Sequence, residues 1–386
     1  MTLAVTYKLP RFTPAGTPRV LHVRTVKGNG GGPEKTLLRG AVHLRRLGVH
    51  AEALYLLDAH TPSDALIERA SRSELTVHVV RERSALDPAG PGALARLIRT
   101  GRFDIIHTHD YKANALARML MAAGRYRIVA TAHGYNQTTR REGAYYALER
   151  MILRRADAVI CPSRRLADLL ADSGVSPERL HVIHNGIELD QWPFRPRGVR
   201  KDPPVVLYVG RLSREKNVQA LLQAAAMLRR RGAALRLRIA GQGPAEEELA
   251  ELAGQLGLDG QIEWLGWRAD VSDLLAGADL FVNPSTTEAM PNSVLEALAT
   301  GTPVVATDAG ATDELVLHER TGLLIPPGDV GALAEALGRL LADADLGRAL
   351  AWQGRSHVEE HFDFARRMAH VVALYRGVLA AAGWPR

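Results

Sequence analysis

The chain has 386 residues, of which 46% are hydrophobic and 24% charged, so it is long enough for two globular domains and is neither disordered nor collagen-like. Its net charge of +7 favours anionic partners without choosing among phosphate esters, nucleic acid and anionic lipid. No apolar stretch approaches the roughly 18 residues of a membrane span. The first 18 residues lack a signal-peptide core, and a lone Cys161 excludes an internal disulfide, so we expect a cytoplasmic protein.

Short β-rich runs alternate with longer Ala-, Leu- and Arg-rich stretches of helical period along the first half of the chain. This alternation is typical of βα units around a parallel sheet. The predicted strands of this half are residues 19–25, 49–57, 75–80, 103–107, 127–132, 158–161 and 180–183. We therefore expect a doubly wound α/β domain over residues 1–190.

A proline-rich stretch without helical or alternating pattern interrupts the series and predicts a linker at residues 191–204. A second series of strands follows at residues 205–209, 235–240, 261–265, 280–282, 303–306 and 322–325, which predicts a second doubly wound domain over residues 205–363. The amphipathic segment 364–386 should form a last helix, which could cross back to the first domain. Ligands of such domains bind beyond the carboxyl ends of the strands, and we expect a cleft there.

A glycine-rich loop follows the first predicted strand, from Gly28 to Glu34, and a helical stretch begins directly after it. Glycines allow a ligand to approach the backbone closely, Pro33 suits a first helical turn, and the N–H groups of a helix N-terminus attract anions. The loop matches neither the dinucleotide fingerprint nor the Walker motif. An anion site and a simple tight turn therefore both remain open.

Two cations follow the first strand of the second series. Arg211 and Lys216 stand five residues apart where this strand should end. A guanidinium that can make two parallel hydrogen bonds and a compact ammonium suit a diphosphate. Solvated surface is the alternative for either residue taken alone.

Two glutamates, Glu288 and Glu296, stand eight positions apart in a segment that reads as strand, polar loop, helix and strand. Eight helical residues span about 12 Å, beyond the roughly 5–9.5 Å that separates the two carboxylates of a glycosidase. Ser293 stands three residues before Glu296, so a helix capping box is a structural alternative for the second glutamate.

Together these motifs resemble those of family 4 glycosyltransferases of the GT-B fold, two Rossmann-like α/β domains that face each other across a cleft. The resemblance spans nearly the whole chain and is strongest over residues 205–327. Its pieces are the glycine-rich loop, T-A-H-G at 131–134, H-N-G-I-E at 184–188, G-R-L-x-x-E-K at 210–216, G-Q-G-P at 241–244, L-G-W at 265–267 and the glutamates at 288 and 296. It implies retaining transfer of a sugar from a nucleotide-diphosphate donor to an acceptor hydroxyl, in polysaccharide, lipopolysaccharide or glycolipid assembly.

The resemblance also implies roles for individual residues. Arg211 and Lys216 would hold the diphosphate and stabilise the charge on the leaving group. Glu288 would contact sugar hydroxyls, and His133 would lie beside the donor sugar. The donor-binding residues that it implies, with Glu296 on the ribose and the backbone near Arg268 on the base, are Gly31, Gly32, Arg268, Asn292, Ser293, Val294 and Glu296.

His109 and Asp110 follow a predicted strand, and we expect them on the acceptor side of the cleft. His107 and His109 suggest a metal, but no third ligand stands at a telling spacing. The pair Asp343 and Asp345 ends a helical stretch and is expected on the solvated surface. We therefore expect no metal and no cofactor besides the substrate.

The expected partners are a nucleotide sugar and a glycan, lipid-linked or small-molecule acceptor. Nucleic acid is not expected, because aromatic residues are only 5% of the chain. Residues 145–155 combine an apolar stripe with arginines, and they could pack against the sheet or lie on an anionic membrane at the inner face. Transfer to a natural-product acceptor and a GT-B sugar-nucleotide epimerase remain alternative functions.

Overall fold

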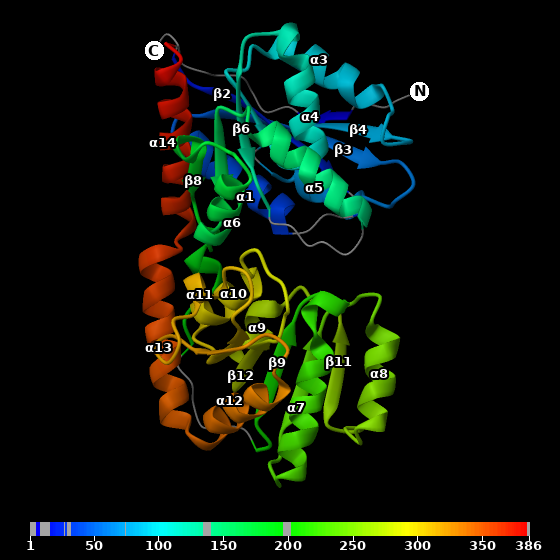
Figure 1. Ribbon diagram of the computed structural model, residues 1–386, viewed down its shortest axis with the longest axis vertical. Coiled ribbons are helices and arrows are strands. Elements are labelled where there is room, and N and C mark those ends of the chain that lie inside the picture. The colour runs from blue at the N-terminus through cyan, green and yellow to red at the C-terminus, as the bar shows by residue number, and fades with distance from the viewer. Residues whose placement is uncertain are drawn as a thin grey trace. The chain divides into compact units, whose positions relative to one another are not determined.

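The computed structural model describes residues 5–7, 16–26, 28, 32–73, 75–133, 140–195 and 202–383 (Figure 1). The chain divides into two compact units. The first comprises Met1–His184 together with Ala365–Arg386, and the second is Asn185–Phe364. The boundary therefore falls after His184, whereas the sequence predicts it after residue 190.

The first unit contains an eight-stranded sheet in the order β1-β4-β3-β2-β5-β6-β7-β8, in which β1 is antiparallel and all other strands are parallel. Its strands are β1 (Val5–Tyr7), β2 (Arg19–Val26), β3 (His50–Asp58), β4 (Thr76–Glu82), β5 (Ile105–Thr108), β6 (Arg127–Thr131), β7 (Ala158–Cys161) and β8 (Leu180–Val182). Every residue of β5 and β7 is buried, as expected for parallel strands with both faces covered.

Helices follow the strands of this unit in alternation, as the sequence predicts. They are α1 (Gly32–Arg46), α2 (Asp64–Ser71), α3 (Ala89–Gly101), α4 (Tyr111–Met119), the short η1 (Leu120–Ala123), α5 (Arg140–Leu153), α6 (Arg164–Asp172), the short η2 (Pro177–Arg179) and α14 (Phe364–Ala381). The side chains of Asp110 and Ser163 accept backbone N–H bonds at the starts of α4 and α6, which satisfies donors that have no partner within the helix. Figure 1 shows the last helix, α14, in red beside the strands of this unit.

The second unit contains a six-stranded parallel sheet in the order β11-β10-β9-β12-β13-β14. Its strands are β9 (Val205–Val209), β10 (Arg236–Ala240), β11 (Ile262–Gly266), β12 (Leu280–Asn283), β13 (Val304–Thr307) and β14 (Leu323–Ile325). Its helices are η3 (Leu189–Gln191), η4 (Arg214–Lys216), α7 (Val218–Arg230), α8 (Glu246–Gln255), α9 (Val271–Ala276), α10 (Asn292–Thr300), α11 (Thr312–Leu315), α12 (Val330–Ala342) and α13 (Ala344–His361).

Each sheet has a hydrophobic core on both faces. In β9, Val206 and Tyr208 belong to one core, and Leu207 belongs to the core on the opposite face. In β3, Leu54 and Tyr55 divide between two cores in the same way. This two-residue alternation follows from strand geometry, and it explains why the strands read as nearly continuous apolar runs.

The strand order reverses once in each sheet. In the first unit β2 lies between β3 and β5, and in the second β9 lies between β10 and β12, so successive connections leave these strands on opposite sides. Such a reversal opens a crevice at the carboxyl ends of the two strands, where doubly wound folds bind ligands. Ligand sites are therefore expected at the loops after β2 and β5 and at those after β9 and β12.

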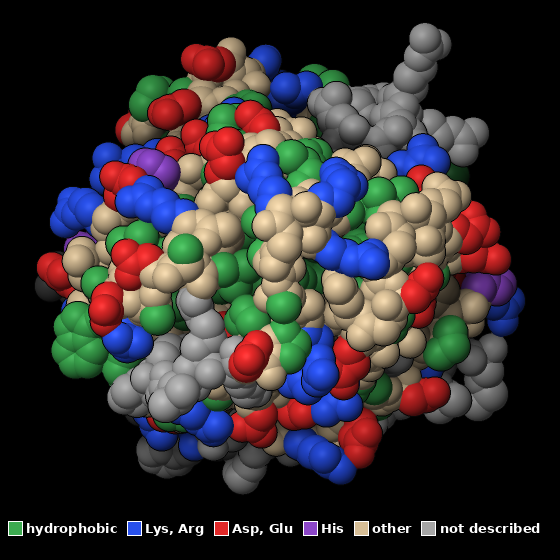
Figure 2. Space-filling model, turned by 90° about the horizontal axis from the view of Figure 1, so that it is seen from below, with side chains coloured by type: hydrophobic (Ala, Val, Ile, Leu, Met, Phe, Trp, Pro, Cys, Tyr) green, Lys and Arg blue, Asp and Glu red, His purple; other side chains and the backbone are tan. Residues whose placement is uncertain are grey.

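Figure 2 shows a face on which basic and acidic side chains are interspersed, so the net positive charge is not gathered there. Among the described residues, no helix is long and apolar enough to span a bilayer.

Candidate active site

The loops after β9 and β12 bring together a lysine and a glutamate at the switch point of the second sheet. The Nζ of Lys216 lies 2.6 Å from the Oε1 of Glu288, although the two residues are 72 positions apart in the chain. The Glu288 side chain is 10% exposed and that of Lys216 24% exposed. The pair is therefore partly shielded from water, which strengthens its attraction relative to an exposed pair.

Glu288 has hydrogen-bond partners besides Lys216. Ser285 Oγ lies 2.8 Å and Asn283 Nδ2 lies 3.4 Å from the same Oε1 atom. Gly310, in the loop after β13, adopts a φ of +63°, and a Cβ built on it would lie 1.6 Å from the backbone oxygen of Glu288. Only glycine fits this close approach, so the loop after β13 fixes the backbone that carries the glutamate.

Backbone bonds connect the two loops that supply the pair. Thr286 N donates to the carbonyl oxygen of Glu215 at 2.8 Å, and the hydroxyl of Thr286 approaches the same oxygen at 3.2 Å. Thr307 donates its hydroxyl to the carbonyl oxygen of Ser285. These contacts fix the relative positions of Lys216 and Glu288 before any ligand binds.

Arg211 lies on the same loop as Lys216 and its side chain is exposed at the end of β9. The hydroxyl of the buried Tyr208 donates to the carbonyl oxygen of Arg211 at 2.9 Å. The backbone of Arg211 is thus anchored while its guanidinium faces solvent. Such a cation can reach an anion at the strand end without first breaking a buried contact.

The helix α10 begins directly after the β12 loop. Its first residues show that the capping box suggested by the sequence does not form. Pro291 occupies the N-cap position, and no side chain caps the helix there. Ser293 therefore lies inside the first turn, and Ser293 with Glu296 does not form a capping box, because that motif requires Ser293 itself at the N-cap position. Glu296 is half-buried on α10.

Three further predicted donor-binding residues have defined surroundings. Val294 is buried, and its N–H donates to the carbonyl oxygen of Pro291 at 3.2 Å. The Asn292 side chain is exposed and its Oδ1 accepts from Asn185 Nδ2 at 3.3 Å. Arg268 pairs through two nitrogens with Asp270, at 2.8 and 2.5 Å, so its side chain is already engaged.

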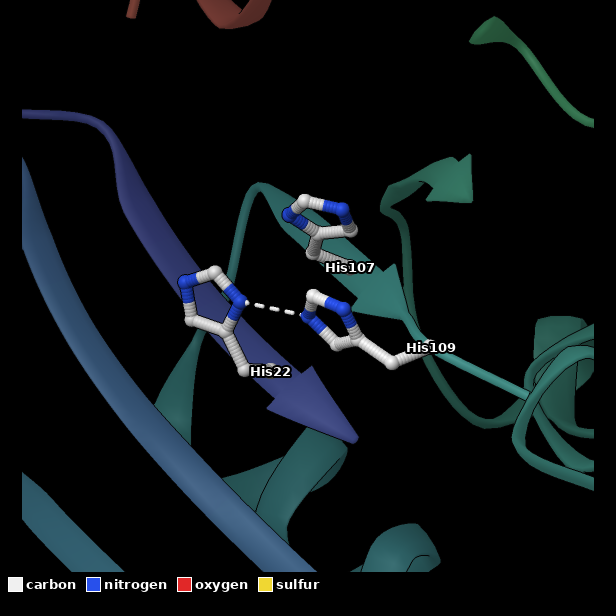
Figure 3. Close-up of side chains that lie close together, drawn as sticks. All are labelled: His22, His107 and His109. Carbon is white, nitrogen blue, oxygen red and sulfur yellow. Dashed lines mark hydrogen bonds between the residues drawn. The ribbon is translucent and has the colours of Figure 1, made fainter. Parts of the chain in front are cut away.

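His109 and Asp110 lie at the switch between β2 and β5, and His133, which follows β6, lies beside His109. Parallel pairing places His22 of β2 beside His107 of β5, and His109 follows β5 (Figure 3). His22 Nδ1 lies 3.0 Å from His109 Nε2, and the rings of His109 and His133 stack with centroids 5.9 Å apart. His133 is exposed, whereas His22 and His107 are buried.

Sequence reasoning missed His22. It found no third histidine for His107 and His109, but the ligand nitrogens of all three lie within 4.8 Å of one another. Only the register of β2 against β5 shows that His22 lies beside His107, since 85 residues separate the two in the chain. Both nitrogens of His107 have partners, however, because Tyr375 Oη lies 2.6 Å from Nδ1 and Thr131 Oγ1 lies 2.7 Å from Nε2. The trio is arranged for hydrogen bonding, and a metal would have to displace one of these partners.

Asp110 has a structural role that accounts for both its oxygens. Its Oδ1 accepts the N–H of Ala113 at the start of α4, and its Oδ2 accepts the N–H of Thr25 at 2.6 Å. Burial raises the pKa of Asp110, and these N–H bonds oppose the shift.

Gly32, one of the two predicted glycines of the glycine-rich loop, is the first residue of α1, whereas Gly31 lies outside the described residues.

Comparison with known proteins identifies the class. The structure matches that of HepE from Anabaena, solved in complex with UDP, with a TM-score of 0.79 and 23% identity, covering 93% of this chain and 100% of that one. Two doubly wound units with this likeness have the GT-B fold.

Sequence comparison gives the family. Residues 30–191 match the model of Glycosyltransferase Family 4, and residues 203–343 match that of Glycosyl transferases group 1. The alpha-maltose-1-phosphate synthase of Mycolicibacterium smegmatis is 31% identical over 72% of this chain and 79% of its own. A UDP-Gal:alpha-D-GlcNAc-diphosphoundecaprenol alpha-1,3-galactosyltransferase of Escherichia coli is 28% identical over 73% of this chain and 78% of its own. The chain belongs to the family 4 glycosyltransferases and is a glycosyltransferase.

Proposed function

We propose that the chain moves a sugar from a nucleotide-diphosphate donor to an acceptor hydroxyl, with retention at the anomeric carbon. The observation that carries the proposal is the pair formed by Lys216 and Glu288 at the switch between β9 and β12. A cation, a carboxylate and a helix N-terminus meet there at the carboxyl ends of parallel strands. This is the environment in which such folds hold phosphorylated ligands.

The proposed chemistry follows from the charges of these residues. When the bond between the anomeric carbon of the donor sugar and the diphosphate oxygen breaks, the nucleoside diphosphate leaves, and negative charge grows on it. Lys216, held by Glu288, and the exposed Arg211 would stabilise that charge, together with the N-terminus of α10. Glu288 also has a second carboxylate oxygen, to which sugar hydroxyls could donate.

Glu296 is proposed as a ligand of the nucleotide ribose. Its alternative role in a capping box is excluded because Ser293 is not the N-cap residue of α10, and a half-buried carboxylate on the first helix after the loop can accept hydroxyl hydrogen bonds. The backbone around Arg268 is the proposed contact of the base, and His133 that of the donor sugar.

We also propose that the diphosphate is neutralised by these cations without a divalent metal. Asp343 and Asp345 have other roles, which supports this proposal. Asp343 accepts the N–H of Leu346 and caps α13, and Asp345 forms an ion pair with Arg348. Neither carboxylate belongs to the β9 and β12 loops.

Glycan assembly is the proposed setting, since relatives of this chain include a galactosyltransferase whose acceptor is a diphosphoundecaprenol-linked sugar. The HepE complex makes a uridine nucleotide the first donor to test. The decisive assay incubates the purified chain with UDP-, GDP- and dTDP-sugars and a panel of lipid-linked and free glycan acceptors. A product whose anomeric proton coupling matches the donor configuration supports the proposal, and inversion of that configuration contradicts it.

An anionic membrane is the proposed surface on which a lipid-linked acceptor is met. Helices α4 and α5 pack against each other, and the exposed side chains at the end of α4, in η1 and on α5 include Met119 (76% exposed), Met121 (38%), Leu148 (42%) and Met151 (55%). We propose that these apolar side chains form the surface that meets the membrane.

The charges around these side chains match anionic lipid. Arg118, Arg154 and Arg155 are exposed, and Arg118 and Arg155 line one small cavity. Among residues 111–126 and 146–156 the acidic side chain is that of Glu149, which is buried. Arginines beside exposed apolar side chains, without exposed carboxylates, are typical of helices that lie in the interface of an anionic bilayer.

Sedimentation with vesicles tests this contact. The protein should sediment with vesicles rich in phosphatidylglycerol but not with pure phosphatidylcholine, and Met119→Asp with Met151→Asp should abolish the binding. Leu86→Asp is the matched control, because Leu86 is 93% exposed outside these helices. Equal binding by the double variant and the wild type would refute the proposed surface.

A further inference from the structure

A row of four imidazoles leads from the buried sheet of the first unit to its carboxyl edge. The ring centroid of His109 lies 5.3 Å from that of His22, 4.3 Å from that of His107 and 5.9 Å from that of His133. Figure 3 shows the hydrogen bond that joins His22 to His109, with His107 above it. His109 is half-buried and thus joins the buried rings to the exposed one.

The hydrogen bonds divide this row into two sets. His107 lies between the hydroxyls of Tyr375 and Thr131, at 2.6 and 2.7 Å, and both its nitrogens are satisfied. His22 and His109 satisfy each other through Nδ1 and Nε2 at 3.0 Å. The direction of the bond between His22 and His109 decides which nitrogen of each of these two rings carries the proton.

These rings are neutral at ordinary pH. Burial, followed by the charge of Arg367, lowers the pKa of His22 to about 3. Burial also lowers the pKa of His109 well below its ordinary value, with neighbouring histidines and Arg24 adding to the shift. A neutral imidazole has one N–H, so one nitrogen of each ring donates and the other can only accept.

The burial of His22 Nε2 assigns the direction of the bond. Among the described residues this atom has no hydrogen-bond partner, although it is buried. If His109 donated, His22 would carry its proton on Nε2, as an orphaned buried N–H, which folded proteins avoid more strictly than an unused acceptor. His22 therefore donates from Nδ1, and His109 accepts at Nε2 and carries its own proton on Nδ1.

We propose that His22 is a positioning residue, which locks His109 as the Nδ1–H tautomer and so makes it a hydrogen-bond donor at the carboxyl edge of the first sheet. This inference rests on the proposed function in one respect, since it takes that edge to be where a hydroxyl of a sugar substrate binds. A donor there would bind a hydroxyl oxygen, whereas the other tautomer would present only a lone pair. His22 acts through His109 and does not itself contact the substrate.

Two substitutions separate this role from simple filling of space. The amide nitrogen of asparagine can occupy the position of imidazole Nδ1, whereas that of glutamine corresponds to Nε2. His22→Asn can therefore still donate to His109 Nε2, and His22→Gln cannot. Both replace an aromatic ring by an amide, so they match in polarity, and asparagine, which is one methylene smaller, loses more packing than glutamine.

Nitrogen-15 NMR of histidine-labelled protein reads the tautomer directly. We expect the two-bond N–H couplings of His109, assigned by their disappearance in His109→Gln, to show Nδ1–H in the wild type and in His22→Asn. His22→Gln should lose this pattern. An Nε2–H pattern for His109 in the wild type overturns the proposal, even if no His22 variant folds.

Kinetics gives the second measurement. His22→Gln should lower kcat at least tenfold with KM for the nucleotide sugar within about twofold, and His22→Asn should restore kcat to within about threefold of the wild type. Equal kcat in the two variants contradicts the positioning role. If no sugar is transferred by any form, the proposed function fails, while the tautomer measurement still decides the assignment.

Discussion

Gly310→Ala tests how strictly the loop after β13 holds the glutamate of the candidate site. The added Cβ would lie 1.6 Å from the backbone oxygen of Glu288, and real Cβ contacts are not closer than about 3.0 Å, so the two loops must separate by at least about 1.4 Å. The carboxylate bound to Lys216 moves with that backbone. A misplacement of about 1 Å in an active site can cost a hundredfold in rate, so we expect kcat/KM to fall at least about a hundredfold.

Gly328→Ala is the matched control. Gly328 has a φ of +80°, close to the +63° of Gly310, but its Cβ would meet nothing within 4 Å. The left-handed backbone should cost each variant about 1–2 kcal/mol of the free energy of unfolding, and the overlap should add about 1–3 kcal/mol in Gly310→Ala alone. Gly328→Ala should therefore keep its turnover.

The assay measures nucleoside diphosphate release alongside thermal unfolding for both variants. We expect both variants to lose stability and only Gly310→Ala to lose activity. Comparable turnover in the two variants would show that the backbone of Glu288 is not part of a precise site.

Four further results are expected. Arg211→Ala and Lys216→Ala should each lower kcat at least about a hundredfold while the protein stays folded, and near-normal turnover in either would contradict its role at the diphosphate. Glu296→Gln should weaken nucleotide binding about tenfold or more in calorimetry with little change in melting, because no capping box is lost. Activity should survive EDTA, and loss restored by Mg²⁺ or Mn²⁺ would refute metal independence. Burial raises the pKa of Glu149 to about 7, so the folded state binds the extra proton and the free energy of unfolding should fall between about pH 4.5 and 7. Glu149→Gln should remove up to about 3 kcal/mol of that fall, and an unchanged pH dependence of denaturant unfolding would contradict it.

Much of the fold could be predicted because each strand is a short apolar run between turn residues. All thirteen predicted strands are present, with ends shifted by no more than two residues, since burial on both faces imposes a strong local pattern. The antiparallel β1 was missed, because three residues at a sheet edge carry no such pattern. Trp192, in the predicted linker, is buried in a core of the second unit, which proline content alone could not reveal.

The site was only partly predictable. Lys216 and Glu288 were found through motifs, but their contact depends on the parallel pairing of β9 with β12. The capping box suggested for Ser293 and Glu296 was wrong, because the helix begins two residues earlier than that pattern requires. His22 has no local signal, and only the register of β2 against β5 brings it to His109.

Calorimetric titration of UDP, GDP and dTDP into the wild type and Lys216→Ala tests most directly whether the switch point of the second sheet holds a nucleoside diphosphate. If it does, at least one of the three binds the wild type with one-to-one stoichiometry and binds Lys216→Ala at least about tenfold more weakly. Absence of binding by all three, or equal affinity in the folded variant, would contradict it.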